Sequence, residues 1–141
     1  AMADGDFSNN IQENQKGEVG ELANTFITLK STIQSLNNEL QKINRAGEQG
    51  QLDVRADSSY FKGVFKDLIN GLNLSLDSII RPLNVAAEYV DRISKGDIPP
   101  KIIDGYKGDF NEIKNNLNLS KCIVFLLRQR RKKASSGFCF S

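Results

Sequence analysis

The sequence contains no histidine and no tryptophan, and its only two cysteines, Cys122 and Cys139, lie near its end. Without histidine the chain cannot hold a His-based triad, a histidine general base, a phosphohistidine or a histidine metal ligand. The two cysteines match no zinc-binding spacing and cannot form a disulfide framework. We therefore expect no catalytic residue, no metal site, no cofactor and no enzyme activity. A reducing, cytoplasmic setting is the default for such a chain.

Long apolar segments are also missing. The longest apolar run is residues 123–127, whereas a helix that spans a bilayer needs about 20 apolar residues. Residues 1–10 are acidic and polar, unlike a signal peptide. We expect neither a membrane span nor a secretion signal in this sequence.

Apolar residues make up only 39% of the 141 residues, against about 45–50% in an ordinary globular domain. This composition suits a narrow seam between helices that a second copy of the chain completes. The net charge of +2 is unevenly distributed, because five basic residues lie within 128–133 while all 17 acidic residues precede them. Residues 1–127 are therefore mildly acidic, and we expect no nucleic-acid partner.

A heptad pattern runs through residues 18–45, where apolar residues recur at alternating steps of three and four. They are Val19, Leu22, Phe26, Leu29, Ile33, Leu36, Leu40 and Ile43. The pattern predicts an amphipathic helix whose seam faces other helices. An antiparallel hairpin inside one globule is the alternative.

Two further helices are predicted, one from Gly63 to about Lys95 and one from near Gly108 past Leu117. Pro82 lies inside the first of them. An interior proline removes a backbone hydrogen bond and costs about 3 kcal/mol, but it is well tolerated at the start of a helix. We therefore interpret Pro82 as a junction between two structural units.

An internal repeat appears at an offset of 45, where residues 61–75 match residues 106–120 at eight of fifteen positions. Four asparagines recur within or beside it: Asn70, Asn73, Asn115 and Asn118. They either fix the register near the seam or are simply solvated.

The linking stretches, 47–62 and 96–107, have the composition of loops. Each still carries apolar residues at a fixed distance after a glycine: Leu52 and Ala56 after Gly50, and Ile98 and Ile102 after Gly96. We expect these glycines to end the preceding helices at positive φ. The apolar residues are predicted to hold each connector against the helices, although incidental loop packing would also explain them.

The chain repeats one order of elements: a helix, a connector of the form Gly-x-apolar-x-x-x-apolar, and a second helix that opens near a glycine. This order resembles a HAMP domain, a relay module of bacterial receptors and sensor kinases. The resemblance covers residues 5–120. It divides the chain into a partial unit (1–32), a second unit (33–80), a third unit (81–122) and an atypical basic tail (123–141). The partial unit has connector residues Gly5, Phe7 and Ile11, and a second helix opened by Glu18, Val19 and Gly20. Gly63 and Gly108 open the second helices of the other units.

The resemblance implies an all-α fold in which two parallel copies of the chain form a four-helix coiled coil. The expected dimer core comprises Leu22, Phe26, Leu29, Ile33, Leu36, Leu40, Ile43, Phe65, Leu68, Leu72, Val90, Ile93, Phe110, Ile113 and Leu117. The implied function is to relay conformational change from an upstream sensory module to a downstream output domain. The other partners would be these domains of the parent receptor, with no small-molecule ligand.

The strings Gly-Asp-Ile-Pro-Pro-Lys-Ile and Tyr-Lys-Gly-Asp-Phe-Asn-Glu-Ile-Lys look most like the tandem arrays of methyl-accepting chemotaxis receptors. The alternatives are a relay in a sensor histidine kinase and a structural coiled coil that only dimerises. Interruption of the helices by glycine connectors argues against the purely structural role.

The pattern stops after Cys122. Residues 123–127 are uniformly apolar, and a basic run follows. We predict that this tail is disordered and interpret it as a foreign or frame-shifted end. The alternative is a short segment that binds anionic membranes.

Overall fold

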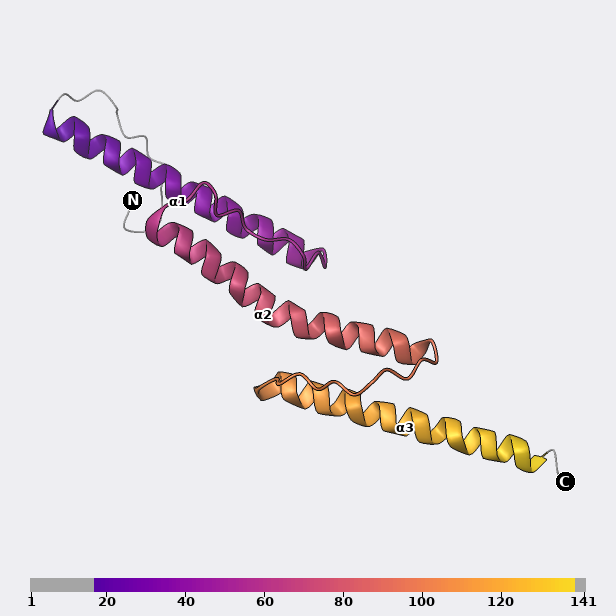
Figure 1. The fold of residues 1–141 in the computed structure, drawn as a ribbon. Helices are drawn as coiled ribbons and strands as arrows, with labels where there is room; N and C mark the ends of the chain where they lie inside the picture. The colour runs from indigo at the N-terminus through magenta and orange to yellow at the C-terminus, as the bar shows by residue number, and fades with distance from the viewer. Residues whose placement is uncertain (1–16, 139–141) are drawn as a thin grey trace. The chain divides into compact units, whose positions relative to one another are not determined.

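The computed structural model describes residues 17–138, with side chains from 17 to 133. Three helices make up this part of the chain: α1 (Glu18–Glu48), α2 (Gly63–Ser94) and α3 (Gly108–Phe138) (Figure 1). No strand lies in the described range. The all-α prediction is confirmed, while the expectations for Gly5, Phe7 and Ile11 fall outside the described residues.

Two compact units divide the chain, one ending at Leu76 and the other beginning at Asp77. Helix α2 therefore supplies its first half to the first unit and its second half to the second unit. Within each unit the two helices run in the same direction, and the connector returns along them (Figure 1). The first connector covers residues 49–62 and the second covers 95–107.

Both connectors begin with the same backbone turn. Gly50 has φ 72°, and its amide and that of Gln51 donate to the carbonyls of Gly47 and Ala46 at 3.1 and 2.8 Å. Gly96 has φ 80° and starts an equivalent pair of bonds of 3.0 and 2.9 Å after α2. This Schellman arrangement satisfies carbonyls that a helix end leaves unpaired, and it needs a left-handed residue. The predicted positive φ is present at both glycines.

The core of the first unit forms around three buried side chains. They are Ala56 and Phe61 from the connector and Ile69 from α2. The half-buried side chains packed against them are Leu36, Ile43, Phe65 and Leu72. Burial of a side chain such as Ile69 contributes about 1.5–3 kcal/mol, so the connector is part of the core and not a free loop.

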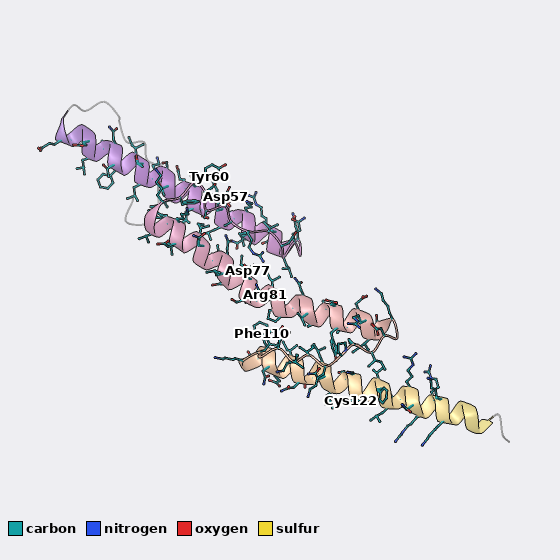
Figure 2. The ribbon with its side chains drawn as sticks, in the orientation of Figure 1. Asp57, Tyr60, Asp77, Arg81, Phe110 and Cys122 are labelled. Carbon is teal, nitrogen blue, oxygen red and sulfur yellow. The ribbon has the colours of Figure 1, made fainter. Side chains whose placement is uncertain are left out.

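The second unit repeats this plan. Its buried residues are Ile80, Tyr89, Pro99, Ile102 and Asn118. Phe110, near the start of α3 (Figure 2), lines a shallow hollow together with Pro82 and Ile102. Residues from α2, the connector and α3 thus meet in one small core.

Pro82 lies in the interior of α2, which continues through it from Gly63 to Ser94. The predicted junction is therefore not a helix end, and the two units separate six residues earlier in the chain. Pro82 is half-buried and lines the hollow of the second unit. Packing of its ring offsets part of the cost of the missing hydrogen bond.

The prediction of a disordered tail is wrong for residues 123–138, because α3 continues through Phe138. Leu, Arg, Lys and Gln dominate this stretch, and all have high helix propensity. No glycine or proline interrupts α3 between Asp109 and Ser136. Propagation of an existing helix costs little, so the change in residue pattern does not end it.

We predict that Gly96→Ala destabilises the second unit by about 1–2 kcal/mol, because L-residues are strained in the left-handed region. The matched control is Gly71→Ala, which lies within α2 with open space around its Cα and should stabilise by about 0.5–1 kcal/mol. Urea unfolding followed by circular dichroism measures both variants. A Gly96→Ala protein as stable as the parent would contradict the proposed cap.

Candidate functional site: an amide clamp on each connector

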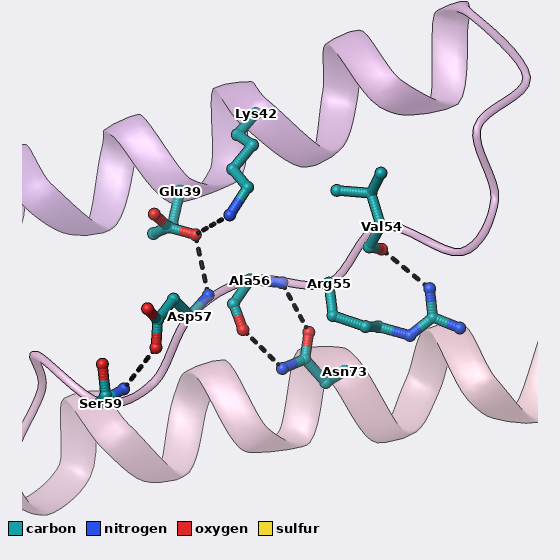
Figure 3. A network of polar contacts seen from close by, with 8 residues as sticks. All are labelled: Glu39, Lys42, Val54, Arg55, Ala56, Asp57, Ser59 and Asn73. Atoms are coloured by element: carbon teal, nitrogen blue, oxygen red, sulfur yellow. Dashed lines mark hydrogen bonds and ion pairs between the residues drawn. The ribbon is translucent and has the colours of Figure 1, made fainter.

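One asparagine side chain holds each connector from the helix that follows it. In the first unit, Asn73 Nδ2 donates to the carbonyl of Ala56 at 2.8 Å, and the amide of Ala56 donates to Asn73 Oδ1 at 3.0 Å (Figure 3). In the second unit, Asn118 makes the same pair of bonds with Ile102, at 3.1 and 2.9 Å. We call each pair an amide clamp. It satisfies both backbone polar groups of a residue that would otherwise bury them unpaired.

The clamp residues differ from both interpretations of the recurrent asparagines. Asn73 and Asn118 are not simply solvated, since each binds the connector of its own chain. Asn70 and Asn115 are exposed. Spacing does not separate the two pairs of asparagines, because Ala56 lies 17 residues before Asn73 whereas Ile102 lies 16 residues before Asn118.

The first clamp has a second anchor on α1. Glu39 Oε2 accepts a hydrogen bond from the amide of Asp57 at 2.8 Å and pairs with Lys42 Nζ at 3.3 Å (Figure 3). Asp57 Oδ1 in turn accepts from the amide of Ser59 at 2.8 Å. This backbone bond lowers the pKa of Asp57 below its ordinary value. The connector is therefore tied to both helices of the unit.

The second clamp is supported by the phenol of a tyrosine, whereas the first is supported by the carboxylate of Glu39. Tyr89 of α2 is buried, and its hydroxyl donates to Asn118 Oδ1 at 3.4 Å. Burial raises the pKa of Tyr89, because the phenolate would lose its hydration. Charged groups thus support the first clamp, while a neutral buried group supports the second.

The end of α2 carries additional polar contacts. Arg92 Nε lies 2.7 Å from Asp97 Oδ2, and Arg128 Nη1 of α3 donates to the carbonyl of Gly96 at 2.9 Å. Cations near a helix C-terminus interact favourably with its partial negative charge. These contacts add to the hydrogen bonds of the Gly96 turn.

The predicted connector residues differ in burial. Ala56 and Ile102, the residues held by the clamps, are buried, whereas Ile98 is half-buried and Leu52 is 41% exposed. Within one chain, the second apolar position of each connector is the anchor. The first apolar position, Leu52 or Ile98, leaves part of its apolar surface exposed to solvent, and Leu52 leaves the most.

None of the fifteen predicted core residues is buried within the single chain. The exposed ones are Leu22, Phe26, Leu29, Leu40, Leu68, Val90 and Ile113. The half-buried ones are Ile33, Leu36, Ile43, Phe65, Leu72, Ile93, Phe110 and Leu117. At the start of α1, Gly20 is buried while Glu18 and Val19 are exposed. The seam predicted from the heptads is therefore only partly covered.

The described residues hold neither a cluster of metal ligands nor a helix that could cross a membrane. Between residues 17 and 138, no three His, Cys, Asp or Glu side chains group closely enough to hold a metal ion. Cys122 is free and exposed. Within the same range, none of the helices combines the length and apolar character that a bilayer crossing requires.

Comparison with known families gives two matches. A HAMP domain model matches residues 60–124, and a second HAMP domain model matches residues 1–35. Together they cover 100 of the 141 residues. The chain belongs to the HAMP domain family. No solved structure matches it.

HAMP domains are signal-relay linkers in receptors, and this chain is a tandem array of them. The 60–124 match takes in Pro82, the second connector, both partners of the second amide clamp and the start of α2. The 1–35 match takes in the first half of α1. The second clamp therefore lies wholly within a matched HAMP domain, while Ala56 of the first clamp lies between the two matches.

We predict that Asn118→Ala destabilises the second HAMP unit by about 2–4 kcal/mol, because it leaves two backbone groups of Ile102 buried without partners. The matched control is Asn115→Ala. Because Asn115 is exposed, this substitution should change the free energy of unfolding by less than about 0.5 kcal/mol. Urea unfolding gives these energies, and hydrogen exchange should show faster exchange of the Ile102 amide. Equal effects at the two asparagines would rule out the clamp.

Proposed function

We propose that this chain is the signal-relay segment of a bacterial chemotaxis-type receptor, located on the cytoplasmic side and acting as a parallel homodimer. The sequence strings around the second connector support the chemotaxis type. A sensor kinase would use the same segment in the same way. In either receptor the segment transmits a conformational change and performs no chemistry.

The observation that carries this proposal is the sharing of α2. The helix is the second helix of the first unit and the first helix of the second unit, with no linker between them. A shift in packing within one unit therefore moves a helix that also forms part of the next core. A scaffold that only dimerised would not need connectors tied into each core.

The uncovered seam supports the homodimer. Leu22, Leu68 and Val90 remain 58%, 54% and 54% exposed in the single chain, although each occupies a predicted core position. Full burial of such a side chain contributes about 1.5–3 kcal/mol. A second copy in parallel register would cover all of these positions at once, because identical heptads then face each other.

The amide clamps give the relay fixed points, because a relay needs rigid contacts as well as parts that move. Each connector is fixed to the helix that follows it, while the seam between the helices would adopt more than one arrangement. Since the two clamps differ in their supporting groups, we propose that adjacent units favour opposite packings. A signal would then pass along the array as an alternation of states.

The homodimer predicts a solution mass near twice that of the chain and independent of dilution, as measured by light scattering after size exclusion. In a Cys122→Ser, Cys139→Ser background, Leu72→Cys should form an intermolecular disulfide rapidly on oxidation. Leu74→Cys, two residues along the same helix and 67% exposed, is the matched control and should cross-link slowly. A monomer, or equal cross-linking at the two positions, would contradict the parallel seam.

The relay itself predicts that locking the first unit alters the second. We expect oxidation of Leu72→Cys to change hydrogen exchange at the Ile102 amide by at least about five-fold, the lower end of typical coupling energies. A Gly-Ser-Gly insertion between Leu76 and Asp77 should abolish this effect. A helical insertion of seven residues, about two turns, should preserve it. If the Leu72→Cys disulfide leaves exchange of the Ile102 amide unchanged in the chain without an insertion, the segment is a static coiled coil.

A further inference from the structure

The second half of α3 carries a surface that the relay does not use. Ile123, Leu126 and Leu127 are 51%, 60% and 59% exposed, and they border a shallow groove together with Arg130 and Lys133. We call these five residues the α3 end face. Large apolar side chains and cations thus lie next to one another on one part of the helix.

Helical geometry places the five residues together. Successive residues rotate by about 100°, so positions three, four, seven and ten beyond Ile123 all lie within about 80° of it around the helix. The other side of this stretch contacts the rest of the second unit, because Val124 is half-buried and Arg128 binds the Gly96 carbonyl. The α3 end face therefore points away from those contacts.

The proposed dimer would leave most of this face uncovered. The seam passes through Phe110, Ile113 and Leu117 and continues to Val124 and Leu127, so a second copy would cover Leu127. Leu126 lies about 200° around the helix from Val124, on the opposite side from the seam. The exposed side chains away from the seam, above all Leu126 and Lys133, thus need an explanation other than pairing with a second copy.

The positive charge around the α3 end face favours an anionic partner. Residues 128–133 contain five cations, and no acidic residue follows Glu112 in the sequence. Phosphate-rich surfaces attract such a segment, but a nucleic acid would gain little from the exposed leucines and isoleucine. A lipid surface uses both parts, because apolar side chains enter the acyl boundary while Arg and Lys extend to the phosphates.

We propose that the α3 end face binds the surface of a bilayer rich in anionic lipid. Ile123 and Leu126 enter the interface, and Arg130 and Lys133 contact the headgroups. The interaction is reversible and weakens with salt, because exposed charges supply much of the attraction. It does not depend on the relay or on the dimer.

The absence of tryptophan from the chain allows a direct test of insertion. Leu126→Trp in the full chain should show a blue-shifted emission when vesicles of phosphatidylcholine with phosphatidylglycerol are added, and no shift with phosphatidylcholine alone. Leu74→Trp is the matched control, since Leu74 is comparably exposed on α2 and should show no shift with either vesicle. An unshifted Leu126→Trp emission would overturn the proposal.

Vesicle sedimentation with the otherwise unaltered chain measures the charge contribution. Each basic residue near an anionic surface is worth about 1 kcal/mol, so Arg130→Gln with Lys133→Gln should weaken partitioning about thirty-fold. Lys62→Gln with Lys66→Gln removes the same charge from exposed positions elsewhere and should leave partitioning unchanged. An equal loss in the two pairs would show a general charge effect and overturn the assignment to this face.

A single-stranded RNA oligonucleotide separates a lipid surface from any polyanion. Ile123→Gln with Leu126→Gln should weaken vesicle binding several-fold, with an unchanged circular dichroism spectrum because both side chains are exposed. Binding that tolerates this double substitution, together with tighter binding of the RNA, would replace the membrane surface by a nucleic acid.

Discussion

The need to pair the backbone of a buried connector governs each unit of this protein. Two helices that run in the same direction require a chain segment that travels back along them, and this segment has neither a helix nor a strand to bond with. Its apolar residues can enter the core only if their peptide groups find partners there. Asn73 and Asn118 supply the partners for Ala56 and Ile102, so parallel packing and a connector within the core both depend on one amide per unit.

The surroundings of that shared bond differ between the units. In the first unit, Glu39, which pairs with Lys42 on the same helix, ties the connector to α1 through a charge that water and salt can screen. In the second unit the buried hydroxyl of Tyr89 contacts the amide directly. The same backbone geometry therefore has two electrostatic environments.

Much of the fold could be predicted from local patterns in the sequence. Heptad spacing located the helices, and Gly50 and Gly96 marked their ends because only a left-handed residue completes that turn. Pro82 and residues 123–138 were misjudged, since tertiary packing and helix propagation outweighed the local signals. The clamps join residues 16 and 17 positions apart and leave no local pattern, so the repeat could show that Asn73 and Asn118 recur but not what they bind. The dimer core remains a prediction.

The clamped residue divides each connector into two segments. The segment before it has the same length in both units, and the segment after it does not. Six positions separate Gly50 from Ala56 and Gly96 from Ile102, and ten separate Gly63 from Asn73 and Gly108 from Asn118. The remaining interval, from clamped residue to next helix, is seven positions in the first unit and six in the second. Length is thus conserved wherever a bond fixes the geometry. The one-residue difference between the units is accommodated in that last stretch, where no clamp bond fixes the path of the connector.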